Sequence, residues 1–308
     1  PCYRFCENAE RRMRKLLLIF LLFIANNALF GQSYSFISYS TSDGLPQSQV
    51  QCIEQDNNGY LWVGTLGGLT KFNGKKFINY SINDGLLNNR ITALSFLNGK
   101  VWVGHEGGVS TLSNGKARNW AFSGFDKKSN VTDIVSFNGL TVIVTNYGGL
   151  YSINQKGKLT TSKYVPQEII QFNDLLVIDK RLLIATASGI FETSDLKSFR
   201  KIALFGSRNI SGFAPKENGE LWVTSFDNGL FKTTTSLQKK DSVPLLTTEF
   251  DIKKCLVDNQ QQLWLNSRSG IIRINKNGNQ LLINDFNGLP VSSIKCVFED
   301  RDGTIWCG

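Results

Sequence analysis

The chain has 308 residues, of which 41% are apolar and 19% charged, so it can bury a sizeable core and does not resemble a disordered tail. Its net charge of +9 falls to +6 beyond residue 32, because residues 1–32 contain five basic and two acidic residues. A charge of +6 without long runs of like charges predicts a solvated surface and argues against nucleic acid as a partner.

The first 32 residues form two segments of different character. Residues 1–12 have no counterpart later in the chain and precede Met13, the only methionine, so we expect them to lie upstream of the natural start. Residues 13–32 combine a basic start with an apolar run from Leu16 to Ala25, which is typical of a signal peptide and short for a membrane anchor. We therefore expect export, cleavage between Ala28 and Ser33, and a periplasmic or cell-surface location.

From residue 33 onward, one short pattern returns several times along the chain. The pattern "YLWVG" recurs with variations and places a tryptophan at positions 62, 102, 222, 264 and 306. Two further units fill the longest gap, and there we expect Ile143 and Ile184 to occupy the tryptophan position. The resulting intervals of 40, 41, 41, 38, 42 and 42 residues indicate a repeat protein.

Each unit contains four short apolar segments separated by turns rich in Asn, Asp and Gly, as in residues 48–81. The second segment is continuously apolar, which predicts a strand covered on both faces. A meander covered by similar meanders is a propeller blade, with the tryptophan as a wedge between blades. We predict an all-β fold, a seven-bladed β-propeller of four-stranded blades over residues 33–308. Six blades are complete, the last is truncated to strands A and B, and residues 34–40 are expected to supply its strand D.

Two segments resemble the repeat of two-component regulator propellers: "GLPQSQVQCIEQDNNGYLWVGTLGGLTKF" near the start and "NGLPVSSIKCVFEDRDGTIWCG" at residues 287–308. The resemblance extends over about residues 34–308 and is weakest in the third and fourth units. It implies an extracytoplasmic ligand-sensing module of a two-component signal transduction protein such as a histidine kinase, without enzymatic activity in this segment. It further implies recognition of a glycan fragment, control of a downstream kinase or transcription output, and a homodimer formed through further domains.

Two other classes of function stay open at this point. One is a surface or secretion-linked propeller scaffold, and the less favoured one is a secreted polysaccharide-active enzyme. The residues predict no catalytic site, no metal and no cofactor. The turns that begin at Asp56 and Asp300 lack the later ligands of a calcium loop, His105 is the only histidine, and the cysteines after residue 33 read as buried thiols.

The connections between strands predict where a ligand would bind. In an up-and-down blade, the A to B and C to D turns share one face of the ring, and the D to A and B to C loops share the other. The second set varies in chemistry from blade to blade, which favours binding of a small polar ligand, for example an oligosaccharide. The candidate ligand-binding rim is Arg90, His105, Glu106, Asn146, Tyr147, Arg208, Phe226, Asp227 and Arg268.

Overall fold

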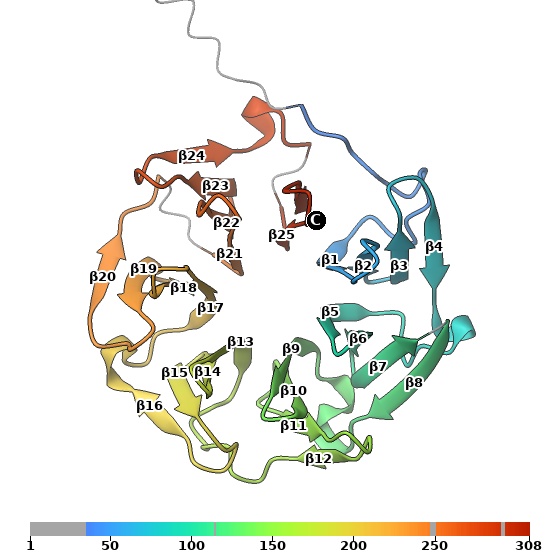
Figure 1. The fold of residues 1–308 in the computed structure, drawn as a ribbon, viewed down its shortest axis with the longest axis horizontal. Helices are drawn as coiled ribbons and strands as arrows, with labels where there is room; N and C mark the ends of the chain where they lie inside the picture. Colours follow the sequence, from blue (N-terminus) through green and yellow to red (C-terminus); the bar gives the residue numbers. More distant parts are fainter. Residues whose placement is uncertain (1–34, 114, 247–250, 291–292) are drawn as a thin grey trace, which may run out of the picture.

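The computed structural model describes residues 35–113, 115–246, 251–290 and 293–308. The expected upstream segment, residues 1–12, and the expected signal peptide, residues 13–32, lie outside the described residues. Six four-stranded antiparallel sheets and one two-stranded sheet surround a central axis (Figure 1). The prediction of an all-β propeller with four-stranded blades is therefore confirmed. No helix in these ranges is long and apolar enough to cross a membrane.

The blades follow one another in chain order. Blade 1 contains β1 (Val50–Gln55), β2 (Leu61–Thr65), β3 (Gly68–Phe72) and β4 (Phe77–Tyr80), and blade 2 contains β5 (Ile91–Leu97), β6 (Lys100–His105), β7 (Gly108–Ser113) and β8 (Lys116–Ala121). Blade 3 contains β9 (Val131–Phe137), β10 (Leu140–Thr145), β11 (Leu150–Ile153) and β12 (Leu159–Thr161), and blade 4 contains β13 (Phe172–Ile178), β14 (Arg181–Thr186), β15 (Gly189–Thr193) and β16 (Arg200–Ile202).

Blade 5 contains β17 (Ile210–Pro215), β18 (Glu220–Ser225), β19 (Gly229–Thr234) and β20 (Lys240–Val243), and blade 6 contains β21 (Cys255–Val257), β22 (Leu263–Ser267), β23 (Gly270–Ile274) and β24 (Gln280–Ile283). The two-stranded sheet contains β25 (Val297–Glu299) and β26 (Ile305–Cys307). Short 3-10 turns occur at η1 (Ile82–Asp84), η2 (Gly124–Lys128), η3 (Ala203–Phe205) and η4 (Asp285–Asn287).

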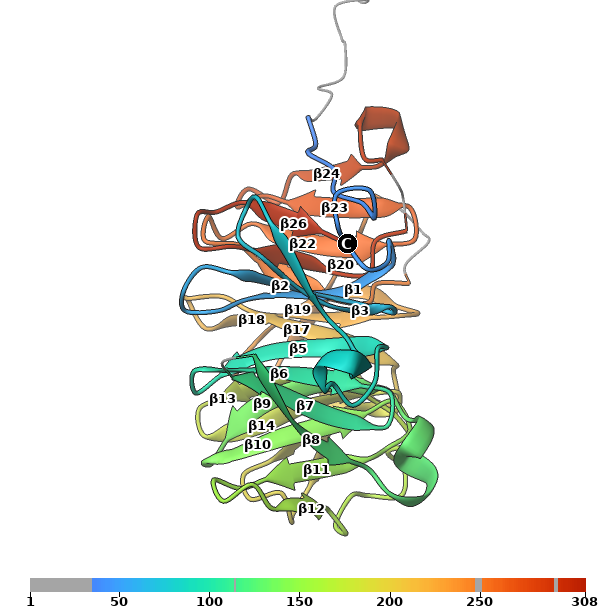
Figure 2. The same ribbon diagram turned by 90° about the vertical axis from the view of Figure 1, so that its right-hand side faces the viewer.

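The connections divide between the two faces of the ring as the sequence predicts. Asn138, in the A to B turn of blade 3, donates a hydrogen bond to the Ser194 carbonyl in the C to D turn of blade 4. On the other face, the B to C loop of blade 2 meets the D to A loop of blade 3, where Glu106 forms a β-bridge with Asn130. Figure 2 shows the ring from its side, with the D to A turns near β8 and β24 projecting toward one face.

The strand register corrects which residues replace tryptophan in blades 3 and 4. Thr65 pairs with Gly68 at the B to C turn, and Trp62 stands three residues before Thr65. Thr145 and Thr186 occupy the same turn position, so Val142 and Leu183 replace tryptophan, and the assignment of Ile143 and Ile184 was wrong by one residue. Because alternate strand residues point to opposite faces, Ile143 and Ile184 pack against the preceding blade instead.

Six apolar clusters fill the six successive interfaces between sheets. Trp62 packs with Val101 and Val103 of blade 2, and Trp222 packs with Leu263 and Leu265 of blade 6. The tryptophan position therefore points toward the following blade throughout, which confirms its predicted role as a wedge. Strand B is buried at every residue of β2 because it has a neighbouring blade on each face.

The two-stranded sheet lies between blades 6 and 1 and contacts both. The Arg301 guanidinium donates to the Asn57 carbonyl at 2.9 Å, and the Asn259 amide donates to the Glu299 carboxylate at 2.8 Å. Residues 35–40 form no strand and run along the outer edge of this sector (Figure 1). Within that segment, the Tyr39 ring lies 6.0 Å from Trp306 and 5.1 Å from Phe72 of blade 1. The segment thus bridges the last sheet and the first blade.

Candidate functional site

The predicted rim divides into two groups of residues on the face of the D to A and B to C loops. In the first group, Arg90 Nε lies 2.9 Å from a carboxylate oxygen of Glu106, and the ion pair is partly exposed. Asn146 joins the same group, because its side-chain oxygen accepts the Asn130 amide at 2.9 Å, beside the bridge from Asn130 to Glu106. Tyr147 follows with 69% of its surface exposed.

The second group lies in blade 5, with Arg268 further along the rim in blade 6. The Arg208 guanidinium donates to the Phe205 carbonyl at 3.0 Å and lies 5.6 Å from the Phe231 ring. Phe226 is half-buried, and its amide donates to the Asn209 carbonyl at 3.0 Å, whereas Asp227 and Arg268 are exposed. Ligand binding by these rim residues remains a prediction.

His105 does not reach this surface, so the expectation of an accessible histidine was wrong. Its side chain is fully buried at the end of β6, and Nε2 lies 2.7 Å from the Ser110 hydroxyl. Burial lowers the pKa of His105 to about 4, because the charged imidazolium is poorly solvated there. His105 occupies the strand position that Thr65 has in blade 1. The Thr65 hydroxyl donates a hydrogen bond to the Gly68 carbonyl across the B to C turn.

The central channel contains a charged cluster that sequence reasoning missed. Asp133 and Asp174 lie in the innermost strands of blades 3 and 4, each just after a shift in the strand register. Lys254 immediately precedes β21. The Asp133 carboxylate accepts the Leu175 amide, and the Asp174 carboxylate accepts the Phe213 amide, each at 2.9 Å. Each aspartate therefore ties its blade to the next. In the sequence, this cluster is indicated by an aspartate within an otherwise apolar strand in two successive units.

Lys254 balances the charge in this channel. Its Nζ lies 3.5 Å from an oxygen of Asp174, and the lysine side chain keeps 47% of its surface exposed. Burial raises the pKa of Asp174 to about 7, although Lys254 opposes that shift. Burial also acts on Lys254, but its pKa is raised because attraction to Asp133 and Asp174 outweighs the loss of solvation. We infer from the lysine's exposure that it stays protonated.

The aspartates of the A to B turns have a structural role that leaves no ligand set for calcium. Asp56 is buried, and one carboxylate oxygen accepts the Asn58 and Tyr60 amides while the other accepts the Trp62 indole N–H at 2.9 Å. Asp258 and Asp300 bond the tryptophans of their own sheets in the same way, each at 2.7 Å. Among the described residues, no group of three metal-ligating side chains is close enough to bind an ion.

The turns before the first and second repeats are each stabilised by an aspartate. Asp84 accepts the Ser81 amide in a capping box that begins η1, and Asp43 accepts the Ser40 amide in the equivalent turn. The cysteines within the described ranges are free thiols, but only Cys296 is buried and Cys52, Cys255 and Cys307 are partly exposed, so the expectation of buried thiols is confirmed for Cys296 alone. Burial raises the pKa of Cys255, Cys296 and Cys307 to about 12.

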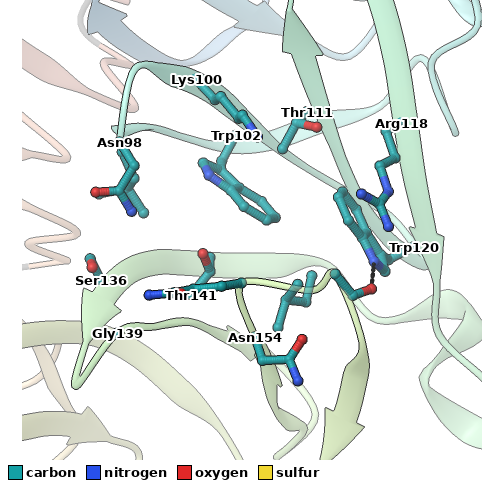
Figure 3. A pocket seen from close by; sticks show the side chains of 14 residues that line it. Asn98, Lys100, Trp102, Thr111, Arg118, Trp120, Ser136, Gly139, Thr141 and Asn154 are labelled. Atoms are coloured by element: carbon teal, nitrogen blue, oxygen red, sulfur yellow. Dashed lines mark hydrogen bonds between the residues drawn. The ribbon is translucent and has the colours of Figure 1, made fainter.

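A pocket of about 430 Å³ opens between blades 2 and 3, on the face opposite the predicted rim (Figure 3). Its wall is formed by the stacked indoles of Trp102 and Trp120, whose ring centres are 5.3 Å apart at an angle of 24°. The Arg118 guanidinium lies 4.8 Å from the Trp120 ring, and the Trp120 N–H donates to the Gly157 carbonyl at 2.8 Å. Sequence reasoning interpreted Trp102 only as a wedge and did not predict this pocket.

Comparisons with known proteins agree with this architecture. A family model described as "Two component regulator propeller" matches residues 44–67 and 288–308. A histidine kinase of Formosa agariphila is 51% identical over 51 residues, which is 17% of this chain and 4% of that protein. The resemblance of these segments to two-component regulator propellers is therefore confirmed.

Solved structures share the fold at low sequence identity. The extracellular domain of a putative hybrid two-component system from B. thetaiotaomicron matches with a TM-score of 0.73 and 20% sequence identity, and the match covers 88% of this chain and 40% of that one. The secretion component PorZ of Porphyromonas gingivalis matches with a TM-score of 0.69 and 14% sequence identity. The match covers 89% of this chain and 46% of PorZ. The chain thus spans less than half of these structures, and these likenesses establish the fold alone.

Proposed function

We propose that this chain, which carries two-component regulator propeller repeats, is an extracytoplasmic ligand-sensing module of a two-component signal transduction protein. The observation that carries the proposal is the pair of family matches, residues 44–67 and 288–308, in the first and last sheets of one propeller. Export by the N-terminal apolar segment and control of a kinase or transcription output belong to the same proposal. So does dimerisation through further domains.

The proposed ligand surface is the rim of D to A and B to C loops, without His105. It combines the exposed Tyr147 and Arg268 side chains with the partly exposed Arg208 and Asn146 side chains. Donors next to an aromatic surface suit a polar ligand that presents hydroxyl or carboxylate oxygens, and a glycan fragment has that chemistry. Because Arg90 is neutralised by Glu106, we assign it a positioning role in this rim.

We also propose that the ring counts seven blades, with residues 35–40 covering the outer edge of the seventh. Support comes from the position of β25 and β26 between blades 6 and 1 and from the Tyr39 ring, which lies near both Trp306 and Phe72. Closure of this kind protects the strand edges that an open ring would expose.

Calorimetric titration against a glycan panel tests the ligand surface. We expect Tyr147→Ala to weaken binding about tenfold, because the exposed ring offers a stacking surface, with little loss of stability. Lys75→Ala, an exposed residue of the opposite face, is the matched control and should leave affinity unchanged. A panel without any binder, or equal loss in both variants, would reject this rim.

The coding sequence that follows residue 308 tests the signalling part of the proposal. A membrane span followed by a kinase or a DNA-binding domain supports a sensor. A secretion-sorting domain would instead support a scaffold, the alternative that the fold likeness to PorZ brings into consideration.

A further inference from the structure

We propose that the pocket between blades 2 and 3 binds a small ligand that combines a flat ring with a carboxylate group. This inference goes beyond the proposed sensor function, because it concerns the opposite face of the ring and requires no signalling output. It rests on a comparison of Trp102 with the equivalent tryptophans of the same chain. Three features that cover or satisfy those tryptophans are absent around Trp102 within the described residues.

The first missing feature is a cation from the same blade. Lys71, Lys232 and Arg273 each stand opposite the tryptophan of their own blade in strand C. Their charged groups lie 5.4, 5.9 and 5.8 Å from the rings of Trp62, Trp222 and Trp264. In blade 2 the residue opposite Trp102 is Thr111, whose short side chain places no cation beside the indole.

The second missing feature is an apolar side chain from the following blade. In blades 2, 4, 5 and 6, the residue just before the tryptophan position of strand B is apolar and almost fully buried. These residues are Val101, Leu182, Leu221 and Leu263. Blade 3 has Thr141 at this position, and its hydroxyl points toward the side where Trp102 lies (Figure 3). A smaller polar residue here leaves room against Trp102 and lines that room with a hydroxyl.

The third missing feature is the carboxylate that accepts the indole N–H. Trp62, Trp264 and Trp306 donate to Asp56, Asp258 and Asp300. The A to B turn of blade 2 is shorter, with Asn98 and Gly99, and the Trp102 N–H has no hydrogen-bond partner among the described residues. A ligand carboxylate in the pocket would supply the acceptor that an aspartate supplies to Trp62, Trp264 and Trp306.

The charge of the pocket lining agrees with an anionic ligand. Lys100 and Arg118 line it, and no acidic side chain does. Neither cation forms an ion pair with a residue in the described ranges, and both are exposed. Guanidinium and ammonium groups near an indole N–H form a set of donors suited to a carboxylate.

The shape of the pocket agrees with a ring. The two stacked indoles offer aromatic surface, and the hydroxyls of Thr111 and Thr141, two largely buried residues, have no side-chain hydrogen bond to any described residue. The volume of about 430 Å³ lies within the range of about 300 to 1,000 Å³ that small-molecule sites occupy. Sugar acids and aromatic acids share the required chemistry of a ring with a carboxylate.

Tryptophan fluorescence and calorimetry of the whole chain test the proposal with three probes: D-galacturonate, 4-hydroxybenzoate and neutral D-galactose. We expect at least one carboxylate to bind and to change the emission, whereas galactose does not. Galacturonate binding would identify a sugar-acid site, and hydroxybenzoate binding would identify an aromatic-acid site. Failure of both carboxylates at millimolar concentration, or equal binding of galactose, would overturn the proposal.

Variants locate the site and separate it from a packing defect. Thr141→Leu restores the apolar filler between the blades and should weaken carboxylate binding at least tenfold. Arg118→Gln keeps the lining size but removes a charge and should weaken it as well. Lys71→Thr removes the cation beside the tryptophan of blade 1, where Val101 still fills the interface, and should leave binding unchanged. Unaltered affinity in Thr141→Leu and Arg118→Gln would refute this location, whatever the rim on the other face binds.

Discussion

The hydrogen bond between the aspartate of an A to B turn and the tryptophan of the same blade can be removed in blade 6 and introduced in blade 5. Asp258 is 4% exposed and accepts the Trp264 indole N–H at 2.7 Å and the Gln262 amide at 2.7 Å. Asp258→Ala leaves a partly buried indole N–H without its charged acceptor, which costs about 1.5 to 3 kcal/mol, and the turn amide adds about 0.5 to 1 kcal/mol. We expect a total loss of about 2 to 4 kcal/mol.

Blade 5 offers the reverse change, because Lys216 stands where the aspartate is found and the buried Trp222 N–H has no acceptor among the described residues. The A to B turns of blades 5 and 6 have the same backbone hydrogen bond. The Lys216 amide donates to the Glu220 carbonyl in blade 5, and the Asp258 amide donates to the Gln262 carbonyl in blade 6, each at 2.9 Å. Lys216→Asp in a Glu220→Gln background avoids two adjacent carboxylates. We expect a gain of about 0.5 to 2 kcal/mol over Glu220→Gln alone.

Urea and thermal unfolding, followed by tryptophan fluorescence and circular dichroism, measure both changes. For a chain of this length, 1 kcal/mol corresponds to roughly 2 °C in Tm. The reasoning predicts shifts of opposite sign in the two blades. It is refuted if Asp258→Ala unfolds like the wild type, or if Lys216→Asp lowers the Tm of the Glu220→Gln background.

Three further predictions concern titrating groups. Lys254→Met should destabilise the fold by about 1 to 3 kcal/mol at pH 8 and by less at pH 5, because the pKa of Asp174 is raised to about 7 and this carboxylate, left without its cation, gains a proton as pH falls. Equal losses at both pH values would contradict this. His105 has a pKa of about 4 when folded and near 6.5 when unfolded, so the unfolded state binds more protons between these values. Stability should therefore fall by about 1.4 kcal/mol per pH unit from pH 6 to pH 4.5, and His105→Thr should remove that part of the slope in pH-dependent urea unfolding. The buried Cys296 should react with iodoacetamide at pH 8 only after denaturation, and rapid labelling of Cys296 in the folded chain, measured by mass spectrometry, would contradict this.

The repeat itself was readable because a propeller blade is encoded locally. Turn residues at fixed spacing, a continuously apolar strand B and a period near 40 residues identify four strands per unit without knowledge of any long-range contact. The division of loops between two faces followed from the up-and-down connection, and the contact of Asn138 with Ser194 agrees with it. The turn role of Asp43 and Asp84 was likewise local, because each bonds a serine three residues before it.

Features that depend on contacts between blades could not be read in this way. A shift of one residue moves a side chain to the other face of a strand, so only the pairing of Thr145 and Thr186 at their turns shows that Val142 and Leu183 replace tryptophan. The burial of His105 depends on packing around the end of β6, and the channel cluster depends on blades 3, 4 and 6 meeting at the axis. The pocket beside Trp102 arises because Thr111 and Thr141, 30 residues apart in sequence, face the same space. The sequence by itself determined the repeated unit and its turns, because those are set by neighbouring residues, whereas the tertiary structure decided which side chains meet between units, because that depends on strand register and on closure of the ring.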